Sequence, residues 1–253
     1  MKLSFPLVVL CTLLLAACNA GSDGEPVAAP DLATPTPTVF TPPELNAADI
    51  PPDIHEDSLA RLPTVIREAL DADGQRAFDV IVNPDSRYAD GLWGPAGMWL
   101  YSPHMAEHIF PASTYLRFGV DGERDQRLVE LTILTTAREL DSQYEWTAHE
   151  PLARSAGLEE EIIELLRFGG PLADAGQLPG LGAPERTIIR VARELINEPK
   201  VSAELFVEAQ ALFGNEGVMD LAGLVGYYTF VSHTLKMFDL HRAPGSQLLL
   251  PLP

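Results

Sequence analysis

The sequence predicts an all-α domain, and three observations favour it. From Ser58 onward, apolar residues recur at helical spacing over roughly 190 residues, a length that suits one domain. Gly and Pro interrupt this pattern at intervals, as they do between helices. No segment shows convincingly the strict alternation of apolar and polar residues that indicates a half-buried strand.

Several of the expected helices have recognisable starts. Ser102 can cap a helix whose first residue is Pro103, and Pro184 lies in the first turn of another. Gly157 separates two further helices. In chain order we expect helices at residues 59–70, 74–82, 103–118, 124–140, 143–156, 159–168, 184–197, 201–213 and 216–238. Pro151 would either bend the helix at 143–156 or start a new one.

The order of these helices indicates a weak internal duplication. Segments 124–168 and 184–238 each contain a long apolar helix, a second helix, and an acidic helix start that leads into an apolar run. The stretch from Leu221 to Val231 is apolar almost all round, so its own domain or a neighbouring subunit must bury it. We therefore expect a homo-oligomer, and we expect His233 to lie in a core or an interface.

The N-terminus is typical of a bacterial lipoprotein. Residues 1–17 carry one positive charge and then an apolar run too short to span a bilayer, which favours a cleaved export signal over a membrane helix. The run ends in Leu15-Ala16-Ala17-Cys18, which resembles a lipobox, so Cys18 would be lipidated and hold the protein at a membrane on its exported side. Ordinary soluble export is the alternative. Residues 18–58 are rich in Pro, Ala and Thr and predict a disordered tether, and residues 59–253 the folded domain.

Charge and cysteine content exclude several classes of function. Loss of Lys2 with the signal would change the formal charge from −19 to −20, and such a surface repels nucleic acid. The chain's two cysteines are Cys11, which lies in the signal, and Cys18, whose sulfur would carry lipid. The domain therefore offers no thiol for a disulfide, a Cys-based zinc site or thiol catalysis.

One group of residues could carry out proton transfer. Glu145 and His149 are four residues apart and share a helix face, and Glu130 lies among apolar residues of the preceding helix. Two carboxylates and an imidazole suit proton transfer near neutral pH. The pair could instead form a surface hydrogen bond, and Glu130 could pair with Arg127 or Arg138.

Motifs spread over most of residues 88–240 resemble one known family. In chain order they are Gly94-Pro95, Trp99, Ser102-Pro103, Tyr115-Leu116-Arg117-Phe118, Arg127 to Leu134, Ser142 to Trp146 with His149, Gly157-Leu158, Glu160-Glu161-Ile162 and Gly226-Tyr227-Tyr228. On these residues the chain resembles the carboxymuconolactone decarboxylase family, which has the alkylhydroperoxidase D-like fold. The resemblance implies an all-helical bundle that forms homo-oligomers with sites near subunit contacts, in a family of lactone decarboxylases and thiol peroxidases.

The resemblance also implies roles for four residues. We expect His149 to be the general acid or base, Glu145 to orient it, Glu130 to transfer a second proton or position the substrate, and Ser142 to supply a hydrogen bond. The peroxidase branch carries Cys-x-x-Cys-x-x-x-His, and Ser142 and Glu145 stand where its cysteines would. Because both redox sulfurs are absent, the thiol peroxidase activity of the family is disfavoured. The activity that we expect is decarboxylation, or a related proton transfer, on a small carboxylic acid or lactone, and it requires no metal or cofactor.

Other interpretations stay open at this stage. The domain could bind a small molecule without catalysis, or serve as an assembly subunit. His104 to His108 matches the H-x-x-E-H pattern of some zinc peptidases, although a solvated helix face accounts for it as well. We expect Tyr144 and Trp146 to be core residues. The candidates for binding an anionic substrate are Arg117, Arg127 and Arg138.

Overall fold

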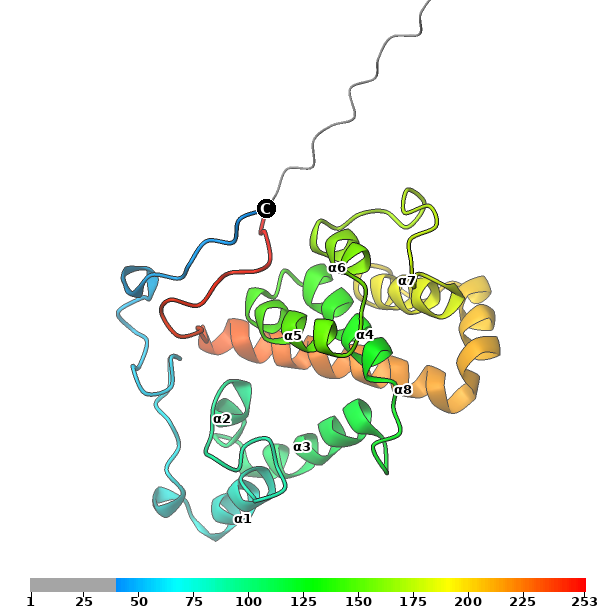
Figure 1. Ribbon diagram of the computed structural model, residues 1–253. Coiled ribbons are helices and arrows are strands. Elements are labelled where there is room, and N and C mark those ends of the chain that lie inside the picture. Colours follow the sequence, from blue (N-terminus) through cyan, green and yellow to red (C-terminus); the bar gives the residue numbers. More distant parts are fainter. Residues whose placement is uncertain (1–39) are drawn as a thin grey trace, which may run out of the picture. The chain divides into compact units, whose positions relative to one another are not determined.

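The computed structural model describes residues 40–253, of which Thr41–Pro253 form one compact unit. The expected export signal, Cys18 and most of the expected tether lie outside the described residues. The unit is all-helical, and its β-structure among the described residues consists of isolated bridges. Figure 1 shows the α-helices α1 (Ala72–Ile81), α2 (Pro95–Trp99), α3 (Pro103–Phe118), α4 (Gln126–Glu139), α5 (Gln143–Ser155), α6 (Glu160–Arg167), α7 (Ala183–Asn197) and α8 (Ala203–Phe238).

The fold class is confirmed, while two local expectations are wrong. Residues 59–70 form turns and one short 3-10 helix, Arg67–Ala69, because their backbone groups bond to distant segments. The Arg61 N–H, for example, donates to the Phe238 carbonyl at 2.8 Å. The second is α2, which was not expected; it is five residues long, too short to show a period, and it follows Gly94 at φ +63°.

The folded unit begins earlier than the sequence predicted. The expected tether extended to residue 58, but residues 41–58 belong to the compact unit. Their backbone pairs with the C-terminal segment: the Leu45 N–H donates to Ser246 at 2.9 Å, and the Leu248 N–H donates to Pro43 at 2.8 Å. A segment with few apolar residues is thus ordered by hydrogen bonds to a partner some 200 residues away, which local composition does not reveal.

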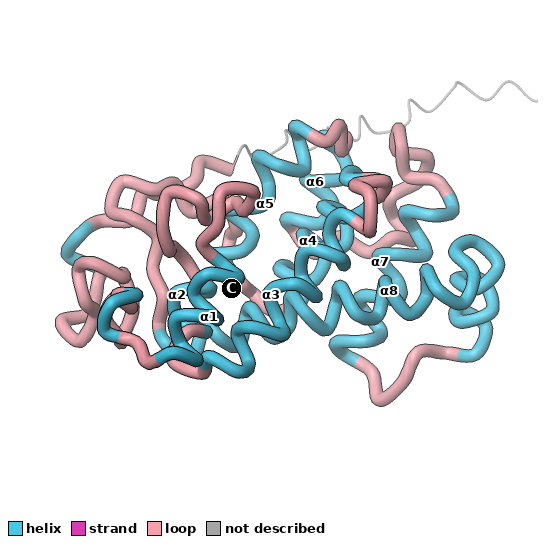
Figure 2. Tube along the Cα trace, turned by 90° about the horizontal axis from the view of Figure 1, so that it is seen from below, coloured by secondary structure: helices cyan, strands magenta, loops and turns pink. Residues whose placement is uncertain are grey.

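Helix α4 lies at the centre of the fold. It packs against α5, α6, α7 and α8, and it contacts the end of α3 (Figure 2). Leu131 and Leu134 on α4 belong to a core shared with α5, α6 and α7, and Val129 and Ile133 to a second core shared with α1, α2, α3 and α8. The α4 residues between these two cores are buried as well, so a polar side chain there must find its partners inside the protein.

Helix α8 joins the two helices expected at 201–213 and 216–238. A break at Gly214, with φ +68° and ψ −179°, separates them. Most of Leu221–Val231 is buried, as expected, but His233 is exposed and so does not lie in the core. His233 lies one turn from exposed Lys236 and Met237, on the face that α8 turns away from its neighbours. No helix within residues 40–253 is both long and apolar enough to cross a membrane.

A tight turn sets the register between α4 and α5. Asp141 is left-handed at φ +49°, its N–H donates to the Arg138 carbonyl at 3.1 Å, and the Ser142 N–H donates to the Ala137 carbonyl at 2.8 Å. These two bonds form a Schellman motif, which ends α4 and reverses the chain within the three residues before α5. Helix α5 therefore returns antiparallel along α4 and continues through Pro151 without starting a new helix.

Candidate active site

His149 lies between two buried carboxylates. Its Nδ1 is 2.7 Å from Glu130 Oε2, and its Nε2 is 3.4 Å from Glu145 Oε2. The three residues are buried, with relative exposures of 7%, 2% and 4%. Glu130 comes from α4, whereas Glu145 and His149 come from one face of α5. The turn at Asp141 thus brings together the three residues that the sequence singled out.

Glu130 is held from two sides. Arg117, at the end of α3, donates from Nη2 to Glu130 Oε1 at 3.2 Å, while Glu130 Oε2 faces the imidazole. An ionised carboxylate can only accept, so Nδ1 must carry the proton in this contact. In the neutral ring, Nε2 is then the free basic nitrogen.

The Nε2 side of the ring faces two partners. The Tyr228 hydroxyl on α8 lies 3.3 Å from Nε2, and its ring meets the imidazole edge to face at 5.1 Å and 89°. With a neutral imidazole, the Tyr228 hydroxyl donates to Nε2; with an imidazolium, the Nε2–H donates to Glu145. Both protonation states of His149 therefore have a partner in place.

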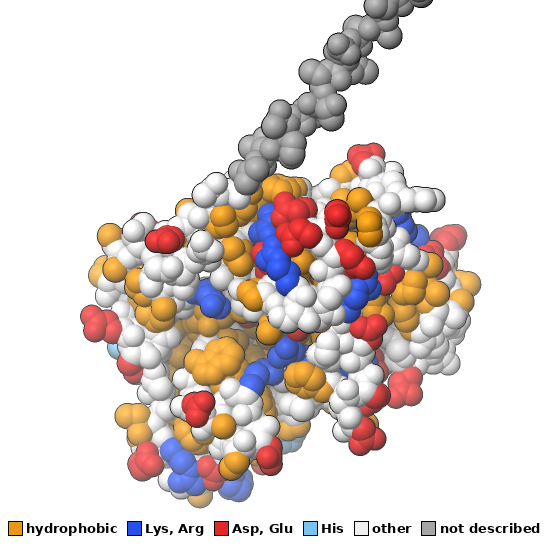
Figure 3. All heavy atoms as spheres, viewed as in Figure 1, with side chains coloured by type: hydrophobic (Ala, Val, Ile, Leu, Met, Phe, Trp, Pro, Cys, Tyr) orange, Lys and Arg blue, Asp and Glu red, His pale blue; other side chains and the backbone are white. Residues whose placement is uncertain are grey.

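These groups lie in the wall of a cavity of about 310 Å³. Glu145, His149 and Arg117 line it, and so do seven aromatic side chains: Tyr88, Trp93, Trp99, Phe118, Tyr144, Tyr227 and Tyr228. Figure 3 shows a hollow on this face, with hydrophobic side chains around it and Lys or Arg side chains at its rim. A mostly apolar cavity with a few converging polar groups is the usual form of a small-molecule site.

Burial acts on the pKa values of the imidazole and the phenols in opposite directions. Burial lowers the pKa of His149, but the hydrogen bonds and charges of Glu130 and Glu145 outweigh it, so the pKa is raised above its ordinary value. Burial raises the pKa of Tyr228 well above its ordinary value, and the pKa of Tyr144 to about 12. The raised pKa favours the protonated form of His149, whereas the phenols stay neutral. Of these groups, the imidazole is therefore the one suited to exchange a proton.

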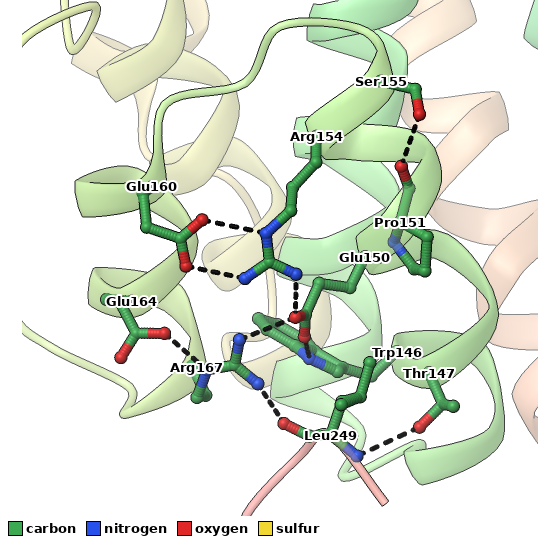
Figure 4. A network of polar contacts seen from close by, with 10 residues as sticks. All are labelled: Trp146, Thr147, Glu150, Pro151, Arg154, Ser155, Glu160, Glu164, Arg167 and Leu249. Atoms are coloured by element: carbon green, nitrogen blue, oxygen red, sulfur yellow. Dashed lines mark hydrogen bonds and ion pairs between the residues drawn. The ribbon is translucent and has the colours of Figure 1, made fainter. Parts of the chain in front are cut away.

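A second face of α5 is anchored by an ion-pair network. Buried Glu150 accepts from Trp146 Nε1 at 2.5 Å, lies 2.8 Å from Arg167 Nη2, and also pairs with Arg154 (Figure 4). Arg167 donates onward to the Leu249 carbonyl, which ties the C-terminal segment to the same network. Because residues 146 and 150 lie one position after 145 and 149, this network fixes the rotation of α5 that points Glu145 and His149 at the cavity.

The other residues named from the sequence lie elsewhere. Ser142 is the N-cap of α5, is buried, and is not among the cavity-lining residues. Arg127 pairs with Glu159 and Glu185, and Arg138 pairs with Asp141, so of the three candidate arginines Arg117 lies at the site.

Tyr144 and Trp146 differ from each other in their surroundings. Trp146 is fully buried in the core, as expected. Tyr144 packs against the second core as expected, and it also lines the cavity together with Trp93 and Pro95. Adjacent residues on a helix face different ways, so Tyr144 reaches the cavity whereas Trp146 does not.

The H-x-x-E-H segment lies apart from the cavity. His104 and His108 are exposed on α3, and His104 Nε2 lies 3.8 Å from Asp73 Oδ2. Within residues 40–253, no group of three or more His, Cys, Asp or Glu side chains is arranged to hold a metal ion. The third ligand that a zinc peptidase would need is therefore not present beside this pair in the described part of the chain.

Sequence reasoning missed Tyr228 and Arg87 as site residues. Tyr228 lies in the almost wholly apolar run of α8, and the Gly226-Tyr227-Tyr228 motif of the resemblance was the signal that could have drawn attention to it. Arg87 lines the cavity from the loop between α1 and α2. No local pattern distinguishes it from other surface arginines.

Comparison with known proteins identifies the fold. No protein-family model matches the chain, and no curated protein matches it. A solved structure is similar: an uncharacterized peroxidase-related protein from Ralstonia eutropha JMP134 with an alkylhydroperoxidase AhpD core. The match has a TM-score of 0.55 and 16% identity, and it covers 73% of this chain and 93% of that one. The chain therefore has the AhpD-like core fold that its motifs suggested.

Proposed function

We propose that the protein is an acid–base enzyme that uses His149 to decarboxylate, or to move a proton on, a small carboxylic acid or lactone. The observation that carries this proposal is the contact set of one imidazole: Glu130 on Nδ1, and Glu145 and Tyr228 at an Nε2 that faces a mostly apolar cavity. A histidine held in one tautomer beside a substrate-sized cavity is the usual form of a general acid or base.

The two carboxylates then take different roles from those expected. Glu130, fixed by Arg117 and bonded to Nδ1, orients the ring and stabilises its charged form. Glu145 lines the cavity and lies near Nε2, where it exchanges a proton with His149 or with the substrate. The sequence had assigned orientation to Glu145. In this proposal Glu130 takes it, because it is the carboxylate within 2.7 Å of the ring and away from the cavity.

Decarboxylation can be written on these groups. The bond between the carboxylate carbon and its neighbour breaks, carbon dioxide leaves, and the bonding electrons pass to an adjacent carbonyl to give an enolate. The His149 imidazolium delivers its Nε2 proton to the carbon that lost carbon dioxide, and becomes neutral. The Tyr228 hydroxyl then donates to Nε2 until a proton from solvent restores the imidazolium.

Thiol peroxidase activity is not part of the proposal. The chain's two cysteines are Cys11 and Cys18, and the positions of a Cys-x-x-Cys pair hold Ser142 and Glu145. Peroxide reduction by this route needs a thiolate nucleophile and a second sulfur to form the disulfide. The peroxidase activity suggested by the name of the similar structure is therefore not proposed for this protein.

We also propose that the enzyme is anchored to a membrane by lipid on Cys18 and forms a homo-oligomer. The lipobox-like Leu15-Ala16-Ala17-Cys18 supports the anchor. Mass spectrometry of the mature N-terminus tests it: a diacylglyceryl cysteine is expected, and an unmodified residue 18 would contradict it. Light scattering tests the oligomer, which the exposed apolar side chains Val207, Met219 and Met237 of α8 support; a monomer at all concentrations would contradict it.

The test of the catalytic proposal is a turnover screen. Purified protein is incubated with β-keto acids and lactones, and His149→Ala, Glu130→Gln and, as a control, His108→Ala are assayed in parallel. We expect kcat to fall about 10²–10⁴-fold in His149→Ala, the usual contribution of a general acid or base, and to stay unchanged in His108→Ala. Equal turnover in the wild type, His149→Ala and Glu130→Gln would reject the proposal. Ligand binding without any turnover would favour the non-catalytic alternative.

A further inference from the structure

Arg87 places a positive charge at the cavity without a carboxylate to match it. It lines the cavity, it is exposed, and among residues 40–253 it forms no ion pair. Its guanidinium lies over the rings of Tyr88 and Phe110, 5.1 and 5.6 Å from their centroids. In a chain with 36 acidic and 17 basic residues, a carboxylate partner would be easy to supply. An arginine that is held by aromatic side chains keeps donors open to a ligand.

The charges around the cavity leave room for one anion. Arg117 is paired with Glu130, and His149 lies between Glu130 and Glu145, so these groups have opposite charges beside them within the site. The Arg87 guanidinium also lines this mostly apolar cavity, and its positive charge is the one that a ligand can match. A bound monoanion would neutralise it, and the hydrogen bonds between a guanidinium and a carboxylate would hold the anion there. The acidic surface as a whole repels anions, so this local charge must provide their attraction.

The aromatic walls limit the rest of the ligand. Trp93 packs against Tyr88 with ring centroids 4.8 Å apart and stays 54% exposed beside Arg87, while Trp99 and Tyr227 lie deeper. A cavity of about 310 Å³ is at the small end of ligand pockets, which run from about 300 to 1,000 Å³. Flat walls and small volume suit a planar body of one ring.

We propose that Arg87 is the specificity-determining residue of this cavity and selects a small, planar organic carboxylate. The ligand's carboxylate lies on the Arg87 guanidinium, and its apolar body extends between the aromatic walls toward His149, a placement that serves the proton-transfer form of the proposed function and not the loss of this carboxylate. This inference rests on the proposed function only for the chemical step after binding. Binding and the selection of a charged ligand do not need His149 to transfer a proton.

A matched pair of probes tests the proposal. Benzoate and benzamide have nearly the same shape, and they differ in charge. Their affinities for the purified full chain are measured by calorimetry, in the wild type, Arg87→Gln, His149→Ala and the control Arg76→Gln, whose arginine is paired with Asp73 on α1. We expect the wild type to bind benzoate at least about tenfold more tightly than benzamide, the effect of a charge-assisted hydrogen bond.

The variants separate this inference from the catalytic proposal. Arg87→Gln should weaken benzoate about tenfold and leave benzamide within about twofold, and Arg76→Gln should change neither. His149→Ala should keep the preference for benzoate even though it loses turnover. Equal binding of the two probes, binding of neither, or a preference that survives Arg87→Gln overturns the inference. A preference lost in His149→Ala and kept in Arg87→Gln overturns it too, since the anion would then lie on the imidazolium.

Discussion

Replacing Glu130 with glutamine tests the centre of the site. Glutamine keeps the volume of the side chain and an oxygen that can accept from His149 Nδ1–H, but it removes the charge that faces both His149 and Arg117. The imidazolium and the Arg117 guanidinium then lose their shared counter-charge in a place that water does not reach, since Glu130 is 2% exposed. The variant therefore isolates the electrostatic part of the contact from its shape.

The expected loss of unfolding free energy is about 3 kcal/mol. Hydrogen bonds to charged groups contribute about 1.5–3 kcal/mol, and removal of one partner from a buried ion pair costs about 3–5 kcal/mol. Because the glutamine amide oxygen would still accept a hydrogen bond, the expected value lies where these ranges meet. The pKa of His149 should fall, since the Glu130 contact is the largest of the effects that raise it.

The pH dependence gives the sign of the effect. The pKa of folded His149 is raised above the unfolded value of about 6.5, so its stabilisation is complete below that pH and is lost as the pH rises through the folded-state pKa. The free-energy gap between wild type and Glu130→Gln should thus be larger at about pH 5.5 than at about pH 9.

Urea denaturation at both pH values and an NMR titration of His149 measure these effects. Glu139→Gln, at the other end of α4 and paired with Arg193, is the control that should leave the His149 titration unchanged. An equal gap at both pH values, together with an unshifted His149 titration, would refute the electrostatic role of Glu130.

Three further outcomes follow from the structure. Tyr228→Phe should lower turnover about tenfold, because it removes the hydroxyl at His149 Nε2. Its unfolding free energy should change by less than about 1.5 kcal/mol, and normal turnover would contradict the role of the hydroxyl. Glu150→Gln should cost about 1.5–3 kcal/mol in chemical denaturation because it removes the buried charge that Arg154 and Arg167 share, although Arg167 keeps Glu164. Exposed Glu160→Gln should cost less than about 1 kcal/mol, and similar losses in both variants would argue against the network. Gly214→Ala should lower the unfolding free energy by about 1–3 kcal/mol, since φ +68° with ψ −179° is open essentially to glycine alone; an unchanged melting temperature would show that the break in α8 relaxes at no cost.

The sequence predicted best what local rules control. The helix expected at 103–118 is Pro103–Phe118 in the structure, because a proline at its first position and a glycine after its end define both boundaries. Glu145 and His149 were paired from their spacing alone, since residues four apart share a helix face. The assignment of Glu130 to the same site depended on the family resemblance as well, because periodicity does not say which helix a buried side chain will contact.

What escaped prediction depends on contacts between distant segments. Residues 59–70 looked helical, yet they bond to residues near 240, which no local window contains. Tyr228 lies 79 positions from His149, and Arg87 comes from a loop before α2. Such residues become site residues through the packing of α8 and that loop over α5, and a single sequence carries no signal for packing of this kind.

The three-residue connection around Asp141, between α4 and α5, should be unusually sensitive to a change in its length. Surface loops ordinarily tolerate insertions, because the elements that they join are held by their own packing. One residue added at the start of α5 would rotate its side chains by about 100°, given 3.6 residues per turn. His149 would then leave Glu130, and Glu150 would leave Arg167, in the same step. The loop is therefore the place where a single inserted codon should abolish the proposed activity without touching any residue of the site.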